Sequence, residues 1–187
     1  MSRTKRLLDI SLSLFALVGL SPLLLLTALV VAVDSGWPPY FCQIRLGLGG
    51  REFGMFKFRS MEKNAAATGA HFTSANDPRI TRIGRFIRRT SIDELPQLLN
   101  VLFGDMSLVG PRPDVPVQRA NYTDEEWAQR CSVRPGITGL AQVVLRSEGS
   151  AAQRLALDLQ YTREASVGLD LTIMLRTIKR LGGQGAN

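Results

Sequence analysis

The longest apolar stretch of the chain lies close to its N-terminus, where no charged side chain occurs between Asp9 and Asp34. Residues 10–33 carry Leu, Ile, Val, Ala or Phe at most positions. This stretch is long enough to cross the hydrocarbon core of a bilayer, which needs about 20 residues. A secretory signal peptide fits less well, because the apolar run is too long and no clear cleavage site follows it. The pattern therefore predicts a membrane segment.

A proline interrupts this segment in its middle, at Ser21-Pro22. Proline removes a backbone hydrogen bond and clashes with the preceding turn, so it bends a helix, and a serine hydroxyl can bond to a freed carbonyl. Three Lys or Arg residues precede Asp9 and twenty follow Asp34, so neither flank is an obvious one to translocate. These features alone leave two arrangements open: a spanning helix, and a helix–break–helix that enters one leaflet and returns.

The pattern changes after a stiff, aromatic exit at Trp37-Pro38-Pro39-Tyr40, which suits the interface of a membrane. Residues 41–44 and 52–59 read as strands, and a glycine-rich turn at 47–50 separates them. This spacing predicts a β-hairpin. No helix follows the glycines, so they are not a nucleotide-binding loop.

Two further segments have an apolar stripe beside basic residues. Ile80, Ile83 and Ile87 predict a helix over 79–89, with arginines on the remaining arc. The second stripe, opposite three basic side chains, consists of Leu171, Met174, Leu175, Ile178 and Leu181. Core packing and docking on a bilayer are both open for this C-terminal helix.

Residues 91–103 predict a helix that ends at Gly104. Ser91 and Glu94 fit a capping box, and Asp93 fits the N-cap equally well. Either choice puts both carboxylates at the positive end of a helix dipole.

The rest of the chain alternates between turn-rich loops and short helices. Loops are predicted at 63–78, at Gly110-Pro111-Arg112-Pro113 and at 134–139. Helices are predicted from a capping box at Thr123 to about Arg130, and over about 151–161.

The chain has 187 residues and a formal net charge of +7, which favours anionic partners such as phospholipids, nucleotide phosphates or nucleic acid. Cys42 and Cys131 show neither a pairing pattern nor metal-ligand spacing, as is typical of a reducing cytoplasm. His71 is the only histidine, so the sequence offers no zinc-binding pattern.

The candidate chemistry centres on the adjacent carboxylates of Asp93 and Glu94, which five arginines precede: Arg79, Arg82, Arg85, Arg88 and Arg89. A carboxylate can act as a nucleophile toward phosphorus, and its neighbour can hold Mg²⁺. Arg88, Arg59 and Arg112 can clamp phosphate oxygens. The alternative is structural: Glu94 caps the helix and Asp93 complements its dipole.

Several motifs occur in order along the chain: Lys5-Arg6 with Asp9, Ser21-Pro22, Lys57-Phe58-Arg59-Ser60-Met61, Arg88-Arg89-Thr90-Ser91-Ile92-Asp93-Glu94-Leu95-Pro96-Gln97-Leu98, Gly104-Asp105-Met106-Ser107-Leu108-Val109-Gly110-Pro111-Arg112-Pro113, Arg134-Pro135-Gly136-Ile137-Thr138-Gly139 and Leu169-Asp170. With them the chain resembles, over residues 3–181, the small monotopic phosphoglycosyl transferases, bacterial sugar transferases that act on polyprenol phosphate.

The resemblance implies transfer of a phospho-sugar from a nucleotide diphosphate sugar, usually a UDP-sugar, to undecaprenyl phosphate, with release of UMP. By the same resemblance, this transfer would be the first membrane step of surface glycan synthesis. It implies a mostly helical α/β fold at the cytoplasmic face of the bacterial inner membrane, with a re-entrant helix over residues 1–35 broken at Ser21-Pro22. Residues 36–187 would form the catalytic domain, with a small hairpin and interfacial helices.

The resemblance also implies roles for single residues. Asp93 is the nucleophile that forms a covalent phospho-sugar, and Glu94 is a ligand of Mg²⁺. Arg88 is implied in binding phosphate and Arg112 in holding the nucleotide, and Asp170 is a carboxylate near the site. With Arg59 and Lys57, these three residues complete the predicted substrate- and phosphate-binding set.

Two departures leave the sugar undetermined: Leu140 stands where many relatives have Trp, and residues 144–149 lack the Asn-Gly-Arg often found there. The sequence also leaves open whether the protein forms a homodimer. The rival hypothesis is a non-catalytic, single-pass membrane protein that binds nucleic acid or anionic lipid. The catalytic interpretation expects no nucleic acid partner, because aromatic stacking residues are sparse near the arginines.

Overall fold

The computed structural model describes residues 2–63, 65, 77–145 and 149–182. His71 and most of the predicted loop 63–78 lie outside these residues, as does the middle of the divergent stretch 144–149.

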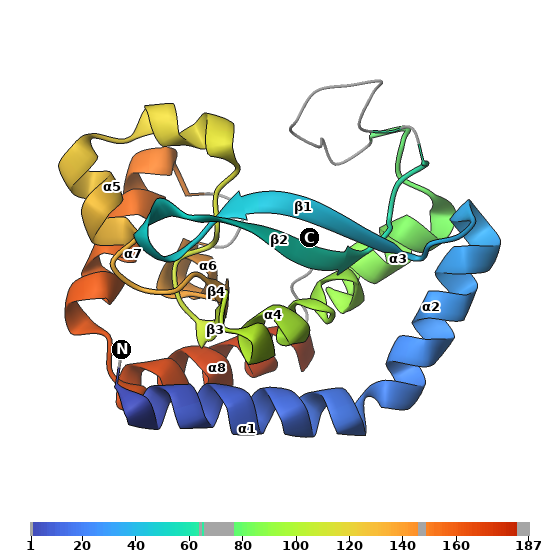
Figure 1. The fold of residues 1–187 in the computed structure, drawn as a ribbon, viewed down its shortest axis with the longest axis horizontal. Coiled ribbons are helices and arrows are strands. Elements are labelled where there is room, and N and C mark those ends of the chain that lie inside the picture. Colours follow the sequence, from blue (N-terminus) through green and yellow to red (C-terminus); the bar gives the residue numbers. More distant parts are fainter. Residues whose placement is uncertain (1, 64, 66–76, 146–148, 183–187) are drawn as a thin grey trace.

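The predicted membrane segment forms two helices, α1 (Arg3–Gly19) and α2 (Ser21–Ser35) (Figure 1). The chain bends by 63° between them. Pro22 lies in the first turn of α2, and the Ser21 hydroxyl donates to the Val18 carbonyl at 2.7 Å. The predicted break at Ser21-Pro22 is confirmed, and a straight helix is wrong.

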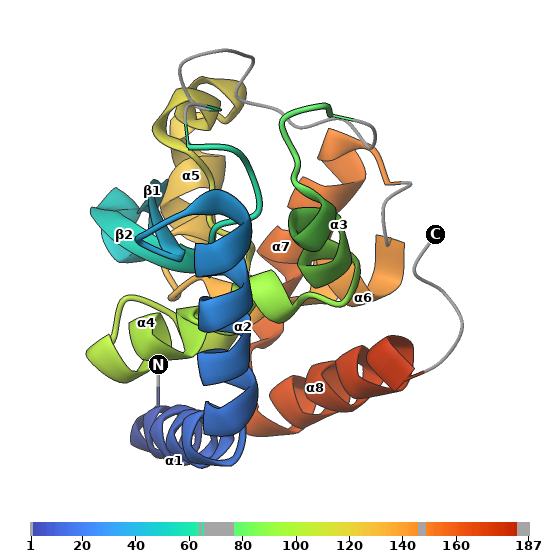
Figure 2. The ribbon, with the colours of Figure 1, turned by 90° about the vertical axis from the view of Figure 1, so that its right-hand side faces the viewer.

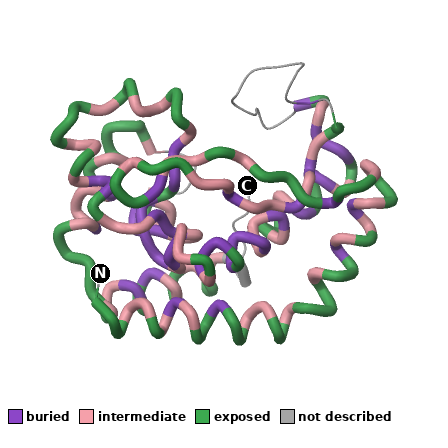
Figure 3. The backbone as a smooth tube through the Cα atoms, viewed as in Figure 1, coloured by how far each residue is buried: buried purple, intermediate pink, exposed green. Residues whose placement is uncertain are grey.

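Among the described residues, no single helix is long and apolar enough to cross a membrane, whereas α1 and α2 together meet that test as a bent pair. Both helices pack on the rest of the fold along one side, α1 against α4 and α2 against α3. Many residues of the two helices are exposed (Figure 3), and these include large apolar side chains. Those exposed by 53 to 82 % are Leu7, Leu14, Phe15, Val18, Leu25, Leu26, Leu29 and Val33.

The predicted hairpin is confirmed. Strands β1 (Tyr40–Leu46) and β2 (Glu52–Phe58) pair antiparallel, with Tyr40 opposite Phe58, and the short 3₁₀ turn η1 (Leu48–Gly50) lies between them. Phe58 is buried against Val31 of α2. The hairpin therefore connects the helix pair with the rest of the fold.

Helix α3 (Arg82–Arg89) begins three residues later than predicted, because the Thr81 side chain caps it by accepting from the Gly84 amide. A Cβ atom at Gly84 would lie 2.0 Å from the Ser60 carbonyl oxygen, so only glycine allows α3 to approach the segment after β2 this closely. Ile87 is buried against β2 and α2.

Helix α4 (Gln97–Phe103) ends as predicted at Gly104, whose φ is +97°. A second, parallel sheet joins β3 (Ser107–Val109) to β4 (Gly136–Thr138). Residues 136–138 were predicted as part of a loop, and that prediction is wrong. A three-residue parallel strand has too short a pattern to be recognised.

Between these strands lie η3 (Pro116–Asn121) and α5 (Asp124–Arg130), and the predicted capping box of α5 is confirmed. Helices α6 (Leu140–Leu145), α7 (Ala151–Glu164) and α8 (Val167–Gly182) complete the described fold. The core of this half contains Val109, Leu140, Tyr161 and Ile173.

Helix α8 lies along the same edge of the molecule as α1 in both views (Figures 1 and 2). Leu171, Leu175 and Ile178 are 46 to 65 % exposed, so core packing is wrong for these three side chains, whereas Met174 packs against the core. The exposed apolar side chains of the two helices lie at one edge, as docking on a bilayer requires.

Candidate active site

The two adjacent carboxylates lie in a tight turn between α3 and α4. Ser91 adopts a left-handed conformation, with φ +57°, and Ile92–Glu94 form the 3₁₀ turn η2. A positive φ at a residue other than glycine costs energy and is common near functional sites.

Neither predicted cap exists. The Ser91 side chain makes no capping bond, and the N-cap of α4 is Pro96. Both capping predictions are wrong, because the 3₁₀ turn uses backbone bonds from Glu94 to Ser91 and from Leu95 to Ile92. The Asp93 and Glu94 side chains therefore have no capping role, which favours the chemical interpretation.

The Asp93 carboxyl is buried, with 7 % of the residue exposed. Burial raises its pKa to about 6, and the negative charge of Glu94 acts in the same direction. The positive charges of Lys57, Arg88 and Arg112 oppose that rise. At neutral pH the carboxylate is the main form, yet it lacks the hydration of an exposed carboxylate.

Glu94 is held by two cations that contact the same oxygen. Lys57 Nζ donates to Oε1 at 2.9 Å and Arg112 Nη2 at 2.7 Å. Burial alone would raise the pKa of Glu94, but Arg112 and then Lys57 outweigh it and lower the pKa to about 2. Neighbouring carboxyls with pKa values pushed apart are typical of acid–base and nucleophilic sites.

The other predicted phosphate ligands divide into two groups. Arg88 lies near Asp93, and its Nε donates to the Ser60 hydroxyl at 2.8 Å. Arg59 instead donates to the Gly36 carbonyl at 3.0 Å, just past the end of α2. The structure thus brings Lys57, Arg88 and Arg112 to the carboxylate pair, and it directs Arg59 to the exit of the helix pair.

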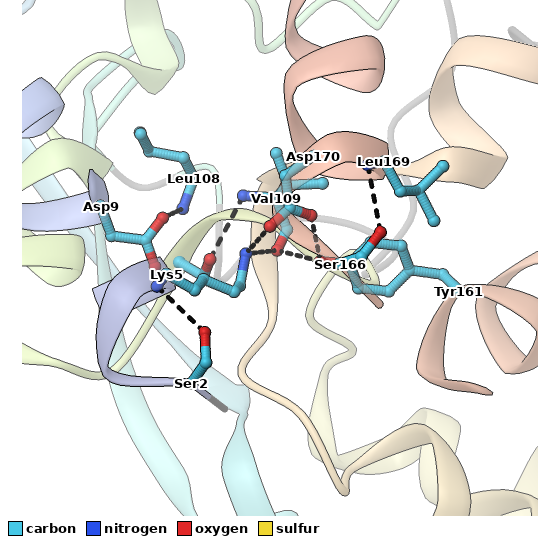
Figure 4. Close-up of polar contacts among 10 residues, drawn as sticks. Ser2, Lys5, Asp9, Leu108, Val109, Tyr161, Ser166, Leu169 and Asp170 are labelled. Carbon is cyan, nitrogen blue, oxygen red and sulfur yellow. Dashed lines mark hydrogen bonds and ion pairs between the residues drawn. The ribbon is translucent and has the colours of Figure 1, made fainter. Parts of the chain in front are cut away.

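Asp170 belongs to a different cluster, at the junction of α1, α8 and β3 (Figure 4). Its carboxylate accepts from Lys5 Nζ at 2.6 Å and from the Tyr161 hydroxyl at 2.7 Å. Lys5 and Tyr161 also both donate to the Val109 carbonyl. Asp9 lies beside them and accepts from the Leu108 amide at 3.2 Å. This cluster ties α1 to the body of the protein.

Breaking this buried pair is expected to destabilise the fold. In Asp170→Asn the ammonium of Lys5, whose side chain is 12 % exposed, loses its carboxylate partner. The loss of one partner of a buried ion pair costs about 3–5 kcal/mol. Chemical unfolding in detergent micelles measures the effect. Asp124→Asn, which breaks an ion pair at an exposed carboxylate, is the control and should change little.

Sequence reasoning missed a second set of arginines, which hold the segment around Arg112. Arg130 Nη2 donates to the Arg112 carbonyl at 2.6 Å, and Arg45 Nη1 donates to the Pro113 carbonyl at 2.9 Å. Arg130 ends α5 and Arg45 lies in β1. No local pattern connects them with the candidate site.

The residues present fit Mg²⁺ only if substrate supplies further ligands. No group of three or more His, Cys, Asp or Glu side chains that could hold a metal occurs in the part of the chain that the structure describes. Lys57 and Arg112 both contact the Oε1 atom of Glu94, and among the described residues the Oε2 atom of Glu94 has no hydrogen-bond partner. Mg²⁺ in phosphoryl-transfer sites is typically bound by one or two carboxylates, substrate phosphates and water. Glu94 Oε2 fits that pattern.

The arrangement is suited to binding a phosphate ester beside a nucleophile. Three cations, Lys57, Arg88 and Arg112, act on the two carboxylates, so one positive charge is in excess. The family profile of the bacterial sugar transferases matches residues 1–183. The chain belongs to this family.

Named relatives of this bacterial sugar transferase agree with the match. The chain is 49 % identical to an undecaprenyl-phosphate glucose phosphotransferase of Komagataeibacter xylinus, over 94 % of this chain and 35 % of that protein. The chain is 45 % identical to the exopolysaccharide production protein PSS of Rhizobium leguminosarum bv. phaseoli, over 93 % of this chain and 92 % of that protein. The chain is 43 % identical to a UDP-N-acetylgalactosamine-undecaprenyl-phosphate N-acetylgalactosaminephosphotransferase of Aeromonas hydrophila, over 97 % of this chain and 44 % of that protein. The chain thus spans less than half of two of these relatives.

Proposed function

We propose that this sugar transferase moves a phospho-sugar from a UDP-sugar to undecaprenyl phosphate, as the first membrane step of surface glycan synthesis. The observation that carries the proposal is the pair of carboxyls: a buried Asp93 with a pKa of about 6 beside Glu94, whose charge is held by two cations. The names of the relatives support the two substrates.

The reaction has two displacements at one phosphorus atom. An Asp93 oxygen attacks the phosphorus that bears the sugar, the bond to the bridging oxygen breaks, and UMP leaves with that oxygen. An oxygen of undecaprenyl phosphate then attacks the same phosphorus and displaces the Asp93 carboxylate. The products are polyprenyl diphosphate sugar and free enzyme, and neither step needs a proton from the protein.

Other residues bind and orient the diphosphate. Arg112 and Lys57 already approach a carboxylate oxygen, and their remaining donors are suited to phosphate oxygens. Arg88 contributes a third positive charge near Asp93. Glu94 would hold Mg²⁺, which would supply positive charge to neutralise the phosphates of the donor.

The test is a panel of UDP-sugars assayed with undecaprenyl phosphate and Mg²⁺, with UMP release as the readout. Because relatives of similar identity are named for glucose and for N-acetylgalactosamine, the panel contains both. Release with at least one donor is expected. No release with any donor, together with salt-dependent DNA binding, would instead support the non-catalytic alternative.

We further propose that α1 and α2 form a re-entrant segment in the inner membrane, with both ends on the cytoplasmic face. The 63° bend and the exposed apolar sides of both helices support this arrangement. A cysteine added before Met1, in a variant lacking Cys42 and Cys131, should react with a membrane-impermeant thiol reagent only in inverted vesicles. Reaction in intact spheroplasts would contradict the re-entrant topology.

A further inference from the structure

The loop that carries Arg112 has an unusual constraint, because prolines flank the arginine on both sides. Pro111 and Pro113 have no backbone N–H, so neither can donate a hydrogen bond that fixes the loop. From Pro111 to Pro113 the loop is held through its carbonyl groups instead. Three in succession accept hydrogen bonds, from the Gly136 amide to Pro111 at 2.9 Å, from Arg130 to Arg112 at 2.6 Å, and from Arg45 to Pro113 at 2.9 Å.

Arg130 is itself rigidly held. Its side chain is 6 % exposed, and the fork donates from Nη1 to Asp114 at 2.5 Å and from Nε to Asp158 at 3.0 Å. The Tyr122 ring lies 5.4 Å from the guanidinium carbon, and the Tyr122 hydroxyl donates to the same Asp114 oxygen at 2.9 Å. All three nitrogens of the guanidinium therefore have a partner, which a lysine cannot reproduce.

Arg45 reaches the loop from the hairpin. Its Nε and Nη2 both donate to Gln43 Oε1, at 3.2 and 2.7 Å, which orients the Nη1 atom toward Pro113. The hairpin, α5 and β4 thus hold three consecutive carbonyls from three directions. The Arg112 side chain, by contrast, is 49 % exposed, and its guanidinium bonds to Glu94.

We infer that Arg130 and Arg45 are positioning residues: they fix the backbone from which Arg112 reaches Glu94 and the diphosphate of the donor. This inference rests on the proposed function, because it assigns Arg112 to nucleotide binding. A long, half-exposed side chain binds phosphate well only if its starting point is fixed, since each freely rotating bond costs entropy on binding. Neither positioning residue touches the substrate.

The test is a double-mutant cycle on UDP binding, with purified protein in nanodiscs, Mg²⁺ present and calorimetry as the readout. Arg112→Ala should weaken UDP binding by about tenfold or more, and Arg130→Lys by about three- to tenfold. If Arg130 acts through Arg112, Arg130→Lys should change the affinity less than about twofold in the Arg112→Ala background. Arg119→Lys is the matched control, because it breaks a similar arginine fork outside the loop and should leave UDP affinity unchanged.

An equal loss in both backgrounds would overturn the inference, because it would mean that Arg130 supports the fold in general. If Arg130→Lys does not fold, Arg45→Gln is put through the same cycle with the same expectation. Failure of the wild-type protein to bind UDP contradicts the proposed function instead, so the two failures are distinguishable.

Discussion

Asp93→Asn is expected to reduce UMP release by at least about 10³-fold and to abolish covalent labelling by the donor. The carboxamide has nearly the shape of the carboxyl but is a poor nucleophile toward phosphorus. UMP release reports the first displacement, and intact-protein mass spectrometry after donor treatment reports the phospho-sugar adduct. Wild-type protein should gain the mass of one phospho-sugar, and the variant should gain none.

The stability of the same variant separates chemistry from folding. The pKa of Asp93 is raised in the folded protein, so its negative charge at neutral pH opposes folding. Replacing it with a neutral amide should therefore leave the unfolding temperature unchanged or raise it. Asp124→Asn, at an exposed carboxylate, should retain activity. Near-normal turnover by Asp93→Asn, or no adduct on active wild-type protein, would contradict the mechanism.

The parts of the fold that sequence predicted are those with a local cause. Pro22 bends the helix pair, glycines turn the hairpin, and Thr123 caps α5, each within a few residues. The turn at Asp93 was predicted as a helix cap because Ser91 and Glu94 have cap spacing. The left-handed backbone of Ser91 prevented it, and no residue type signals that conformation.

In the candidate site, too, sequence predicted the residues with a local signal and missed how the fold places others. Asp93 and Glu94 are adjacent in sequence, and Lys57 and Arg112 come from conspicuous motifs, so residue chemistry pointed to them. Arg59 follows the period of Lys57 along the strand, but β2 ends at Phe58 and the Arg59 side chain donates to the Gly36 carbonyl instead.

The contacts that sequence could not indicate join residues far apart in the chain. Lys5 and Asp170 are separated by 165 positions, and Arg45 and Pro113 by 68. The first contact ties α1 to the body of the protein and the second holds the loop that carries Arg112, and only the folded structure reveals either.

Glu94→Gln is expected to lower the rate of UMP release by about 10²–10³-fold, because it removes the carboxylate that pairs with Lys57 and Arg112 and that is suited to Mg²⁺. Glu125→Gln, at an exposed position of α5, is the control and should be near normal.

The same variant should change the pH dependence in a defined direction. In the wild type the carboxylate form of Asp93 is lost as the pH falls through about 6, so the rate of UMP release should fall there. The charge of Glu94 raises that pKa, and its removal also frees Lys57 and Arg112 to act on Asp93. Both effects lower the pKa, so the residual activity of Glu94→Gln should persist to lower pH. Single-turnover UMP release between pH 5 and 8, at constant Mg²⁺, measures the shift. An acid limb that moves to higher pH would show that Glu94 does not act on Asp93 through its charge.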